Sequence, residues 1–255
     1  MLEARHLVKR FHGISVVRDV SFSVAPGEIV GYLGANGSGK TTTIRMLTGL
    51  IEPSDGAALF DGRPISADPT EYRRRLGYVP EEPHLYPFLS GREYLELVGA
   101  LRNLEPSALH RKIGALLELL DLTDAAERQT ASYSKGMRQK VLLIAALLHD
   151  PDVLIFDEPE SGLDVTAILV LRHLVRLLAG GGKAILYSSH VLESVERLCT
   201  RVLVLQSGRV VADGAPGALR ATEPGASLER IFSGLASRPP EQTARDIANV
   251  IAGHA

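Results

Sequence analysis

The sequence lacks three features that would place it in a familiar class of proteins. Its single cysteine, Cys199, excludes an internal disulfide and suits a reducing compartment. Its longest apolar run, residues 141–148, is far shorter than the roughly 20 residues that span a bilayer. Its net charge of -2 lacks the basic excess typical of proteins that bind nucleic acid constitutively, so we expect no such partner.

The start of the chain also lacks the apolar core of a signal peptide, because charged side chains begin at Glu3. We therefore expect a cytoplasmic chain, whose role at a membrane would come through a partner. The composition is otherwise that of an ordinary globular protein, with 45% apolar and 23% charged residues. A length of 255 residues suffices to bury a core in one large domain or two small ones.

Short runs of alternating apolar and polar residues predict strands in the N-terminal third, at residues 6–8, 20–24 and 28–33. After Gly39 the pattern becomes helical through Leu50, and short strands follow, ending at residues 77–79. Further on, apolar runs at 153–156 and 184–187 lie on either side of a helical pattern. Strands separated by helices predict an α/β fold with a mainly parallel sheet.

Residues 90–149 interrupt this alternation with a signal that is almost entirely helical. Apolar residues recur there at the spacing of one helix face, first as Tyr94, Leu97, Val98 and Leu101, then as Ile113, Leu116, Leu117 and Leu120. Residues 141–148 are apolar all round, which predicts a buried helix. We expect a helical block at 90–149 inserted into an α/β core at 1–89 and 150–234.

A C-terminal extension, residues 235–255, begins with a linker around 237–240. The spacing of Ala244, Ile247, Ala248 and Ile251 predicts a short amphipathic helix in it. That helix would pack on its own domain or contact a second copy, and the pattern leaves both alternatives open.

A phosphate-binding loop is predicted at residues 34–41, which match G-x-x-x-x-G-K-[ST] at every fixed position. The run also lies between a predicted strand and a predicted helix, as the motif requires. Its glycines let backbone N–H groups turn inward, and the helix adds its positive N-terminal end. Lys40 would reach the β- and γ-phosphates, and the Thr41 hydroxyl would ligate Mg²⁺. The expected nucleotide contacts are Asn36, Gly37, Ser38, Gly39, Lys40, Thr41 and Thr42.

Two acids follow the apolar strand predicted at 153–156. Side chains at the carboxyl end of a parallel strand face the crevice where α/β proteins bind ligands. Asp157 is therefore placed to hold Mg²⁺, and Glu158 to orient or deprotonate an attacking water. A capping Asp-Glu pair at a turn is the simpler alternative.

These motifs, in this order, resemble those of the ATP-binding subunits of ABC transporters. Residues 158–164, Glu-Pro-Glu-Ser-Gly-Leu-Asp, are similar to the D-loop that follows the family's catalytic glutamate. Residues 133–137, Tyr-Ser-Lys-Gly-Met, stand where the family carries its signature. His190 follows the next strand, as the family's switch histidine does. The resemblance covers roughly residues 2–232.

The resemblance implies a P-loop NTPase fold: a RecA-like ATP-binding core with a mixed sheet and an N-terminal antiparallel part, plus a helical subdomain that carries the signature. It implies that Phe11 stacks on adenine and that His190 contacts the γ-phosphate. Ser134 and Gly136 would contact the γ-phosphate held by a second subunit, and Asp164 that subunit's phosphate loop. A complete site would therefore need a homodimer or a paired cassette subunit.

Two departures from the family pattern are informative. Glu81 replaces the glutamine of the Q-loop, and we expect it to assist catalysis and to ligate the metal. In the signature, Lys135 and Met137 replace the usual Gly and Gln. The cation of Lys135 would either reach the opposing γ-phosphate or point into solvent. Both departures resemble variants in exporters, as do residues 190–196, 201–205 and 228–232, so we expect an export ATPase.

The resemblance further implies separate transmembrane permease subunits, with this chain bound peripherally at the cytoplasmic face of the cell membrane. A short permease helix would dock near Glu81 and residues 127–130.

Two alternatives to a transport ATPase remain. A non-transport ABC ATPase would usually add a coiled coil, zinc cysteines or a second cassette. A cassette that binds ATP with little hydrolysis is opposed by the intact Lys40, Asp157, Glu158 and His190. The transported substrate is not indicated.

Overall fold

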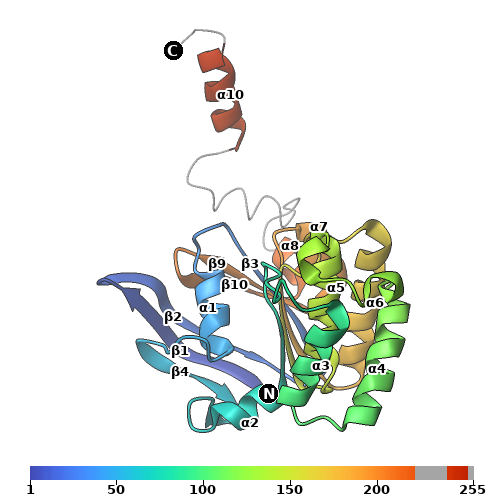
Figure 1. The fold of residues 1–255 in the computed structure, drawn as a ribbon. Coiled ribbons are helices and arrows are strands. Elements are labelled where there is room, and N and C mark those ends of the chain that lie inside the picture. The colour runs from blue at the N-terminus through green and yellow to red at the C-terminus, as the bar shows by residue number, and fades with distance from the viewer. Residues whose placement is uncertain (222–239, 252–255) are drawn as a thin grey trace.

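Two β-sheets and the helices around them make up the described part of the chain, residues 1–221 and 240–251 of a computed structural model (Figure 1). The larger sheet has six strands in the order β10-β9-β3-β8-β7-β6. Each neighbouring pair in it is parallel except β10 with β9. The strands are β3 (Ile29–Gly34), β6 (Leu76–Val79), β7 (Val153–Asp157), β8 (Ala184–Ser188), β9 (Arg201–Gln206) and β10 (Arg209–Gly214). The prediction of an α/β fold with a mainly parallel sheet is confirmed.

A smaller antiparallel sheet has four strands in the order β2-β1-β4-β5. These are β1 (Leu2–Phe11), β2 (Ile14–Val24), β4 (Asp55–Phe60) and β5 (Arg63–Pro64). This sheet and α1 (Lys40–Leu47) share one buried apolar cluster with one face of the larger sheet. Together the two sheets give the mixed β structure expected of an ABC ATPase fold.

The central strands of the larger sheet are apolar over most of their length because both of their faces are buried. In β3, Val30 and Tyr32 belong to the cluster under the small sheet, whereas Ile29 and Leu33 belong to the cluster on the opposite face. Successive side chains of a strand point to opposite faces, so such a strand cannot show polar alternation. Helices α5 (Lys135–Leu147), α6 (Val165–Gly180) and α7 (Leu192–Leu198) contribute the covering residues on that opposite face.

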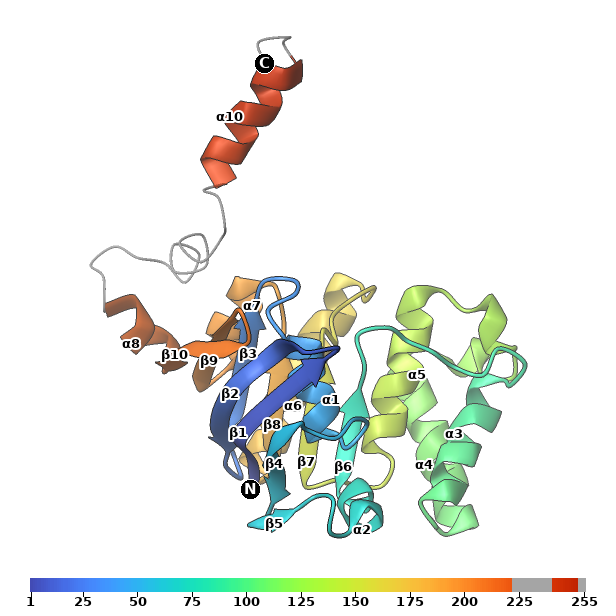
Figure 2. The ribbon, with the colours of Figure 1, turned by 90° about the vertical axis from the view of Figure 1, so that its left-hand side faces the viewer.

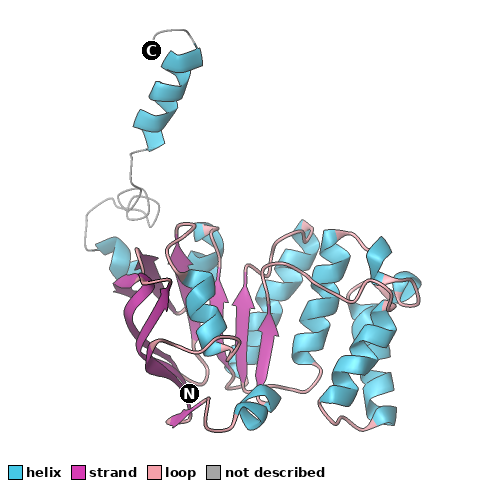
Figure 3. Cartoon of the chain, turned by 60° about the vertical axis from the view of Figure 1, so that its left-hand side comes forward, coloured by secondary structure: helices cyan, strands magenta, loops and turns pink. Residues whose placement is uncertain are grey.

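The helices around the sheets follow the expected alternation, with an all-helical side formed by α3, α4 and α5 (Figures 2 and 3). The remaining α-helices of the described residues are α2 (Pro69–Arg74), α3 (Gly91–Leu101), α4 (Pro106–Leu119), α5 (Lys135–Leu147), α6 (Val165–Gly180), α7 (Leu192–Leu198), α8 (Pro216–Ala221) and α10 (Pro240–Ile251). Short 3-10 turns lie at Thr123–Ala125 and Thr130–Ser132. None of the helices in residues 1–221 and 240–251 is long and apolar enough to cross a membrane.

Helix α5 explains the run that is apolar all round. Its residues Leu142, Leu143 and Ala146 pack in the cluster on the large sheet. Val141 and Ile144, on its other side, pack in a separate cluster with α3 and α4. The buried members of this second cluster all fall between residues 95 and 148. For this reason we propose the helical block at 90–149 as a structural unit, with the core at 1–89 and 150–221; the rest of the predicted core, 222–234, lies outside the described residues.

Local signals account for the helix ends. Helix α3 begins at Ser90, whose hydroxyl accepts a hydrogen bond from the backbone N–H of Glu93, while the Glu93 carboxylate accepts one from the N–H of Ser90. Helix α1 ends at Leu47, earlier than the predicted Leu50, because Gly49 takes a φ of +70° that no helix continues.

Two further helices, α2 and α10, show what the hydrophobic pattern of the sequence did not predict. Helix α2 lies where only short strands were expected, and it begins at Asp68, which caps it, followed by Pro69. The predicted C-terminal amphipathic helix corresponds to α10, in which Ile247 and Ile251 are exposed. Whether that helix packs on its own domain or on a second copy stays open. The expectations for residues 228–232 and for the linker at 237–239 lie outside the described residues.

Candidate nucleotide site

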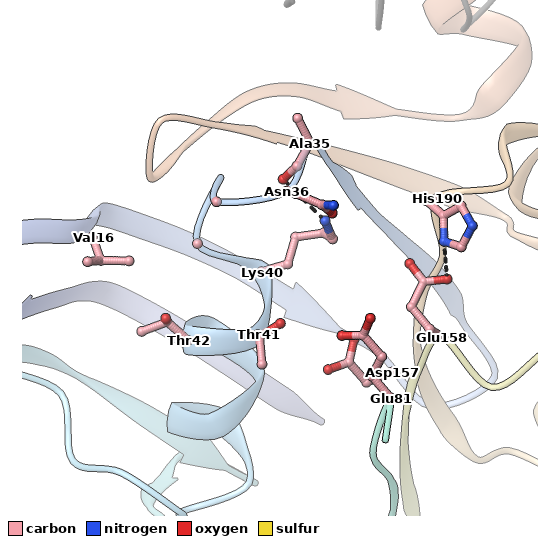
Figure 4. A pocket seen from close by; sticks show the side chains of 12 residues that line it. Val16, Ala35, Asn36, Lys40, Thr41, Thr42, Glu81, Asp157, Glu158 and His190 are labelled. Carbon is pink, nitrogen blue, oxygen red and sulfur yellow. Dashed lines mark hydrogen bonds and ion pairs between the residues drawn. The ribbon is translucent and has the colours of Figure 1, made fainter. Parts of the chain in front are cut away.

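A hollow of about 590 Å³ opens where four parallel strands of the large sheet end (Figure 4). The phosphate loop follows β3, Glu81 follows β6, Asp157 and Glu158 end and follow β7, and His190 follows β8. The residues that line the hollow are Val16, Ala35, Asn36, Gly37, Gly39, Lys40, Thr41, Thr42, Glu81, Asp157, Glu158 and His190. Motifs far apart in the sequence therefore meet in one place, as predicted for residues that follow the carboxyl ends of parallel strands.

The phosphate loop keeps its shape through glycines that no other residue could replace. Gly39 has a φ of +104°, and a Cβ added there would lie 2.9 Å from the backbone oxygen of Val16. A Cβ at Gly34 would lie 2.7 Å from the oxygen of Leu205. Gly39 is also the N-cap of α1, and it offers the helix no side-chain cap. The first turn of α1 therefore presents unsatisfied N–H groups and a positive dipole end to the hollow, which suits an anion.

Lys40 turns back over its own loop. Its ammonium donates to the backbone oxygen of Gly34 at 2.5 Å and to that of Ala35 at 3.4 Å. Burial lowers the pKa of Lys40, while the nearby carboxylates of Glu158, Asp157 and Glu81 oppose that shift. The Lys40 side chain lies beside the three acids. Its hydrogen bonds go to carbonyls of the loop that is expected to hold phosphate.

Asp157 is a buried carboxylate without enough partners. It is 2% exposed, and its Oδ2 atom has no hydrogen-bond partner among the residues that the structure describes. Burial, together with the charges of Glu81 and Glu158, raises the pKa of Asp157 to about 6. A buried carboxylate in this condition is suited to receive a cation.

Glu158 is held in an unusual backbone conformation at the edge of the hollow. Its φ is +50°, its N–H donates to the oxygen of Ser188 at 3.1 Å, and its carbonyl accepts from the N–H of Ser161 at 3.1 Å. Its carboxylate lies 2.7 Å from Nδ1 of His190, which is largely exposed (Figure 4). A left-handed conformation in a non-glycine residue is strained, and such strain is frequent at functional sites.

The residue predicted to stack on adenine is not among those that line the hollow. Phe11 is 43% exposed and is not part of the hollow's lining. The ammonium of Lys9 lies 5.3 Å from the centre of its ring. Val16, which the sequence patterns did not single out, lines the hollow instead. An aliphatic residue carries no chemical signal, and the fold brings the backbone of Val16 close to Gly39 of the phosphate loop. Stacking of adenine on Phe11 stays a prediction.

The other predicted contacts lie outside the hollow and are engaged within the chain. The Ser134 hydroxyl caps α5 by accepting from the N–H of Met137 at 3.1 Å. Asp164 caps α6 in the same way through Ala167. The Lys135 ammonium donates to the Ser161 hydroxyl at 2.6 Å. Ser38 is buried beside the loop, and Gly136 lies against Gly162. The contacts expected from Ser134, Gly136 and Asp164 to a second subunit stay predictions.

The fold and the hollow define a nucleotide-binding α/β protein of the P-loop class. Comparison with known proteins narrows the class. A family model described as "ABC transporter" matches residues 17–161, more than half of the chain. The ABC transporter ATP-binding protein NatA of Bacillus subtilis is 40% identical over 86% of this chain and 89% of its own length. The Nod factor export ATP-binding protein I of Burkholderia lata is 38% identical over 99% of this chain and 82% of its own length.

A solved structure, described as the ATP-binding subunit of an ABC transporter, has the same fold with a TM-score of 0.86. It is 37% identical to this chain, and the match covers 92% of this chain and 99% of the other. The chain belongs to the ABC transporter family. It is an ATP-binding subunit of such a transporter and hydrolyses ATP.

Proposed function

We propose that this chain powers export through separate membrane subunits, by hydrolysing Mg²⁺-ATP at a site completed by a second cassette. The observation that carries the proposal is the convergence of Lys40, Asp157, Glu158 and His190 on one hollow at the strand ends. Export is supported by the similarity to the Nod factor export protein, whose name states that activity. The departures at Glu81 and in the signature agree with it.

The hollow fits a magnesium ion bound together with a nucleotide. The Thr41 hydroxyl and the carboxylates of Asp157 and Glu81 line it, and hard oxygen donors are those that Mg²⁺ prefers. The unpartnered Oδ2 atom of Asp157 needs a cation or a donor. Within the described residues, no group of three His, Cys, Asp or Glu is arranged to hold an ion alone. Phosphate oxygens and water would therefore complete the coordination, and the ion would neutralise charge on the phosphates.

Each polar residue of the hollow has a role in this proposal. The N-terminus of α1 binds the phosphates, and Lys40 exchanges the carbonyl of Gly34 for a phosphate oxygen. His190, which bonds Glu158 in the structure, turns to the γ-phosphate. That exchange frees the Glu158 carboxylate to orient water and accept its proton.

The second subunit would supply the parts that this chain's hollow lacks. Ser134 and Gly136 of a homodimer or paired cassette would approach the γ-phosphate, and Asp164 the phosphate loop. We propose Phe11, whose ring is half-exposed, as the adenine platform.

A second hollow, of about 460 Å³, is suited to the permease helix. It lies between the segment after Glu81 and the helical block, and it is lined by Glu82, Pro83, His84, Leu85, Pro87, Thr130, Ala131, Lys135 and Arg138. Exposed aromatic residues, Tyr86 and Phe88, lie in the same segment. Binding there would hold the chain at the cytoplasmic face of the membrane.

The decisive experiment replaces the proposed base. Glu158→Gln keeps the size and a hydrogen-bonding head but cannot accept a proton, so hydrolysis should fall by roughly 10²- to 10⁴-fold. Binding of ATP should persist, and the variant should elute as an ATP-bound dimer in gel filtration. The matched control is Glu118→Gln, an exposed glutamate on α4, which should leave hydrolysis unchanged.

Full hydrolysis by Glu158→Gln would remove Glu158 from the role of base. A wild-type chain without hydrolysis at high protein concentration, alone and with its permease, would favour the alternative of an ATP-binding switch.

A further inference from the structure

The loop that follows Glu158 is joined to the start of α5, which carries the signature. The ammonium of Lys135 donates to the Ser161 hydroxyl at 2.6 Å, and the Gln139 amide donates to the Pro159 oxygen at 3.1 Å. Between them the backbones touch, because a Cβ added to Gly136 would lie 2.4 Å from the oxygen of Gly162. The first turn of α5 thus contacts the residues that immediately follow the proposed base.

The shape of both segments directs Lys135 onto this loop. Gly162 has a φ of +80°, and a Cβ added there would lie 2.9 Å from Cγ of Lys135. The aliphatic stem of the lysine therefore lies across a glycine that leaves room for it. A long side chain that packs its stem in this way has a defined direction for its charged end. That end reaches Ser161 and not the hollow that contains the phosphate loop.

Ser161 continues the contact to the backbone of Glu158. The N–H of Ser161 donates to the carbonyl of Glu158 at 3.1 Å, which helps to hold Glu158 at its positive φ. The Ser161 hydroxyl accepts from Lys135, and the Ser161 amide donates to Glu158. Ser161 therefore connects the Lys135 side chain to the Glu158 backbone. Displacement of Ser161 would release the strained conformation that places the Glu158 carboxylate.

The core side of the same loop is held by Glu160. Its carboxylate accepts from the Arg172 guanidinium at 2.7 and 2.9 Å, from the Tyr187 hydroxyl at 2.8 Å and from the Ser194 hydroxyl at 3.0 Å. These partners lie on α6, β8 and α7, all packed on the large sheet. The loop is thus fixed to the core through Glu160, and its contacts with α5 run through Pro159, Ser161 and Gly162.

We propose that Lys135 is a positioning residue, which ties the signature end of α5 to the loop that holds the base Glu158, and is not a ligand of the opposing γ-phosphate. The inference rests on the proposed role of Glu158. Lys135 also lines the hollow suited to the permease helix. A partner helix bound there would contact the side chain that holds the base loop, so the same residue would relay part of the partner's stimulation.

The test changes each partner of the Lys135–Ser161 hydrogen bond in the full chain. Lys135→Met keeps the stem and removes the charge, Ser161→Ala removes the acceptor, and Lys135→Arg restores a cation. Each of the first two should lower kcat for ATP hydrolysis about 3- to 10-fold with an unchanged KM, as expected for one partly exposed charged hydrogen bond. The double variant should be no slower than either single variant. Lys135→Arg should recover most of the rate.

A second readout needs no turnover. Hydrogen exchange of the Ser161 amide should become faster in Lys135→Met and return toward the wild-type rate in Lys135→Arg. The matched control is Lys112→Met. Lys112 donates to the carbonyl of Leu148 inside the helical block, at 2.8 Å, so its loss should change neither kcat nor this exchange.

Other results would overturn the inference. If Lys135 binds the opposing phosphate, Lys135→Met weakens ATP-driven dimerisation and raises KM, while Ser161→Ala does neither. Additive losses in the double variant, or no loss in either single variant, would equally contradict a shared role. Glu158→Gln separates this failure from that of the proposed function: an inactive Glu158→Gln with unaffected Lys135 and Ser161 variants rejects only the positioning role.

Discussion

Two helices of this chain begin in similar ways, and the difference between them supports our proposal that the site is divided between subunits. Helix α1 begins at Lys40 after Gly39, and α5 begins at Lys135 after Ser134. The first has no side-chain cap, whereas the second is capped by the Ser134 hydroxyl. Lys40 folds over its own loop beside the acids of the hollow, while Lys135 is exposed and bonds Ser161.

An uncapped helix N-terminus with a preformed loop is complete as an anion site within one chain. At the start of α5 the Ser134 hydroxyl already accepts the N–H of Met137, so a phosphate there would have to share or replace this cap bond. The comparison therefore suggests that α1 binds nucleotide in the isolated subunit, whereas α5 acts on a nucleotide only when another subunit presents one. The predictions below separate these two roles, from the largest expected effect to the smallest.

The largest effect is expected at α1. Lys40→Ala removes the charged donor of the phosphate loop, so the affinity for ATP should fall about 10²-fold or more, because hydrogen bonds to phosphate through a cation are among the strong ones. Titration with a fluorescent ATP analogue measures the loss. Lys112→Ala is the control and should bind normally. Normal affinity in Lys40→Ala would show that α1 alone binds the nucleotide and would weaken the comparison.

The second effect concerns Asp157, a buried residue that lines the same hollow. Its pKa is raised to about 6 from an ordinary 3.8, mainly by burial. A raised carboxyl pKa means that the folded state favours the protonated form more strongly than the unfolded state does. The stability it contributes is fully present below pH 3.8 and is lost as the pH rises through about 6. Above that pH, the folded chain holds an unfavourable buried charge.

Asp157→Asn mimics the protonated form, so it should stabilise the nucleotide-free chain by about 1–3 kcal/mol at pH 7.5. The gain should shrink as the pH falls toward 4. Urea unfolding in buffer without Mg²⁺ measures both values. The same variant should lose Mg²⁺-dependent ATP hydrolysis, since an amide is a weaker ligand for this ion. Equal gains at both pH values would show that the carboxylate is not the cause.

These two sites also show what the sequence could predict. The phosphate loop and the acids after β7 were predictable because each depends on a local pattern, a strand followed by a turn of defined chemistry. The apolar run at β7 likewise predicted a buried strand, whereas β3 was predicted from an alternating pattern and is buried on both faces. Helix α2 was missed because its short segment has too few apolar positions to show a period, although Asp68 and Pro69 mark its start.

The contacts of Lys135, Glu160 and Val16 were not predictable for a different reason. Each joins segments that are distant in the sequence, and no local pattern reports the approach of two backbones at Gly136 and Gly162. Glu160 illustrates this clearly. In the sequence it is one more acid between Glu158 and Asp164, whereas the structure surrounds it with Arg172 and two hydroxyl groups.

A third, smaller effect is expected at the capped end of α5. Ser134→Ala removes the cap and should destabilise the chain by about 1 kcal/mol. Ser90→Ala is the matched control, because Ser90 caps α3 in the same helical block. Only Ser134→Ala should reduce ATP-driven dimerisation in a Glu158→Gln background, and neither variant should change binding of ATP by the monomer. Equal dimerisation in both variants would reduce Ser134 to a helix cap.

The smallest effect is expected at Glu81, in a segment that borders both hollows. Glu81 lines the hollow in front of α1, while the next residue, Glu82, lines the hollow that Lys135 shares. The charge of Glu81 also helps to raise the pKa of Asp157. Removing it should therefore lower the pKa of Asp157, remove repulsion toward the γ-phosphate, and make Mg²⁺-ATP easier to bind near neutral pH.

Glu81→Gln should accordingly raise basal hydrolysis about 2- to 5-fold in the isolated subunit, since a partly screened charge near the phosphates is worth about 1 kcal/mol or less. The acid limb of its pH profile should move to lower pH. We expect the permease helix to stimulate hydrolysis by pushing Glu81 toward the metal. A variant that hydrolyses ATP faster without this movement should be stimulated less. Glu82→Gln is the control and should leave the basal rate and the acid limb in place. A Glu81→Gln variant with unchanged basal rate, pH profile and stimulation would make this position a passive hinge, and the two helix N-termini would then be coupled through Lys135 and Ser161 alone.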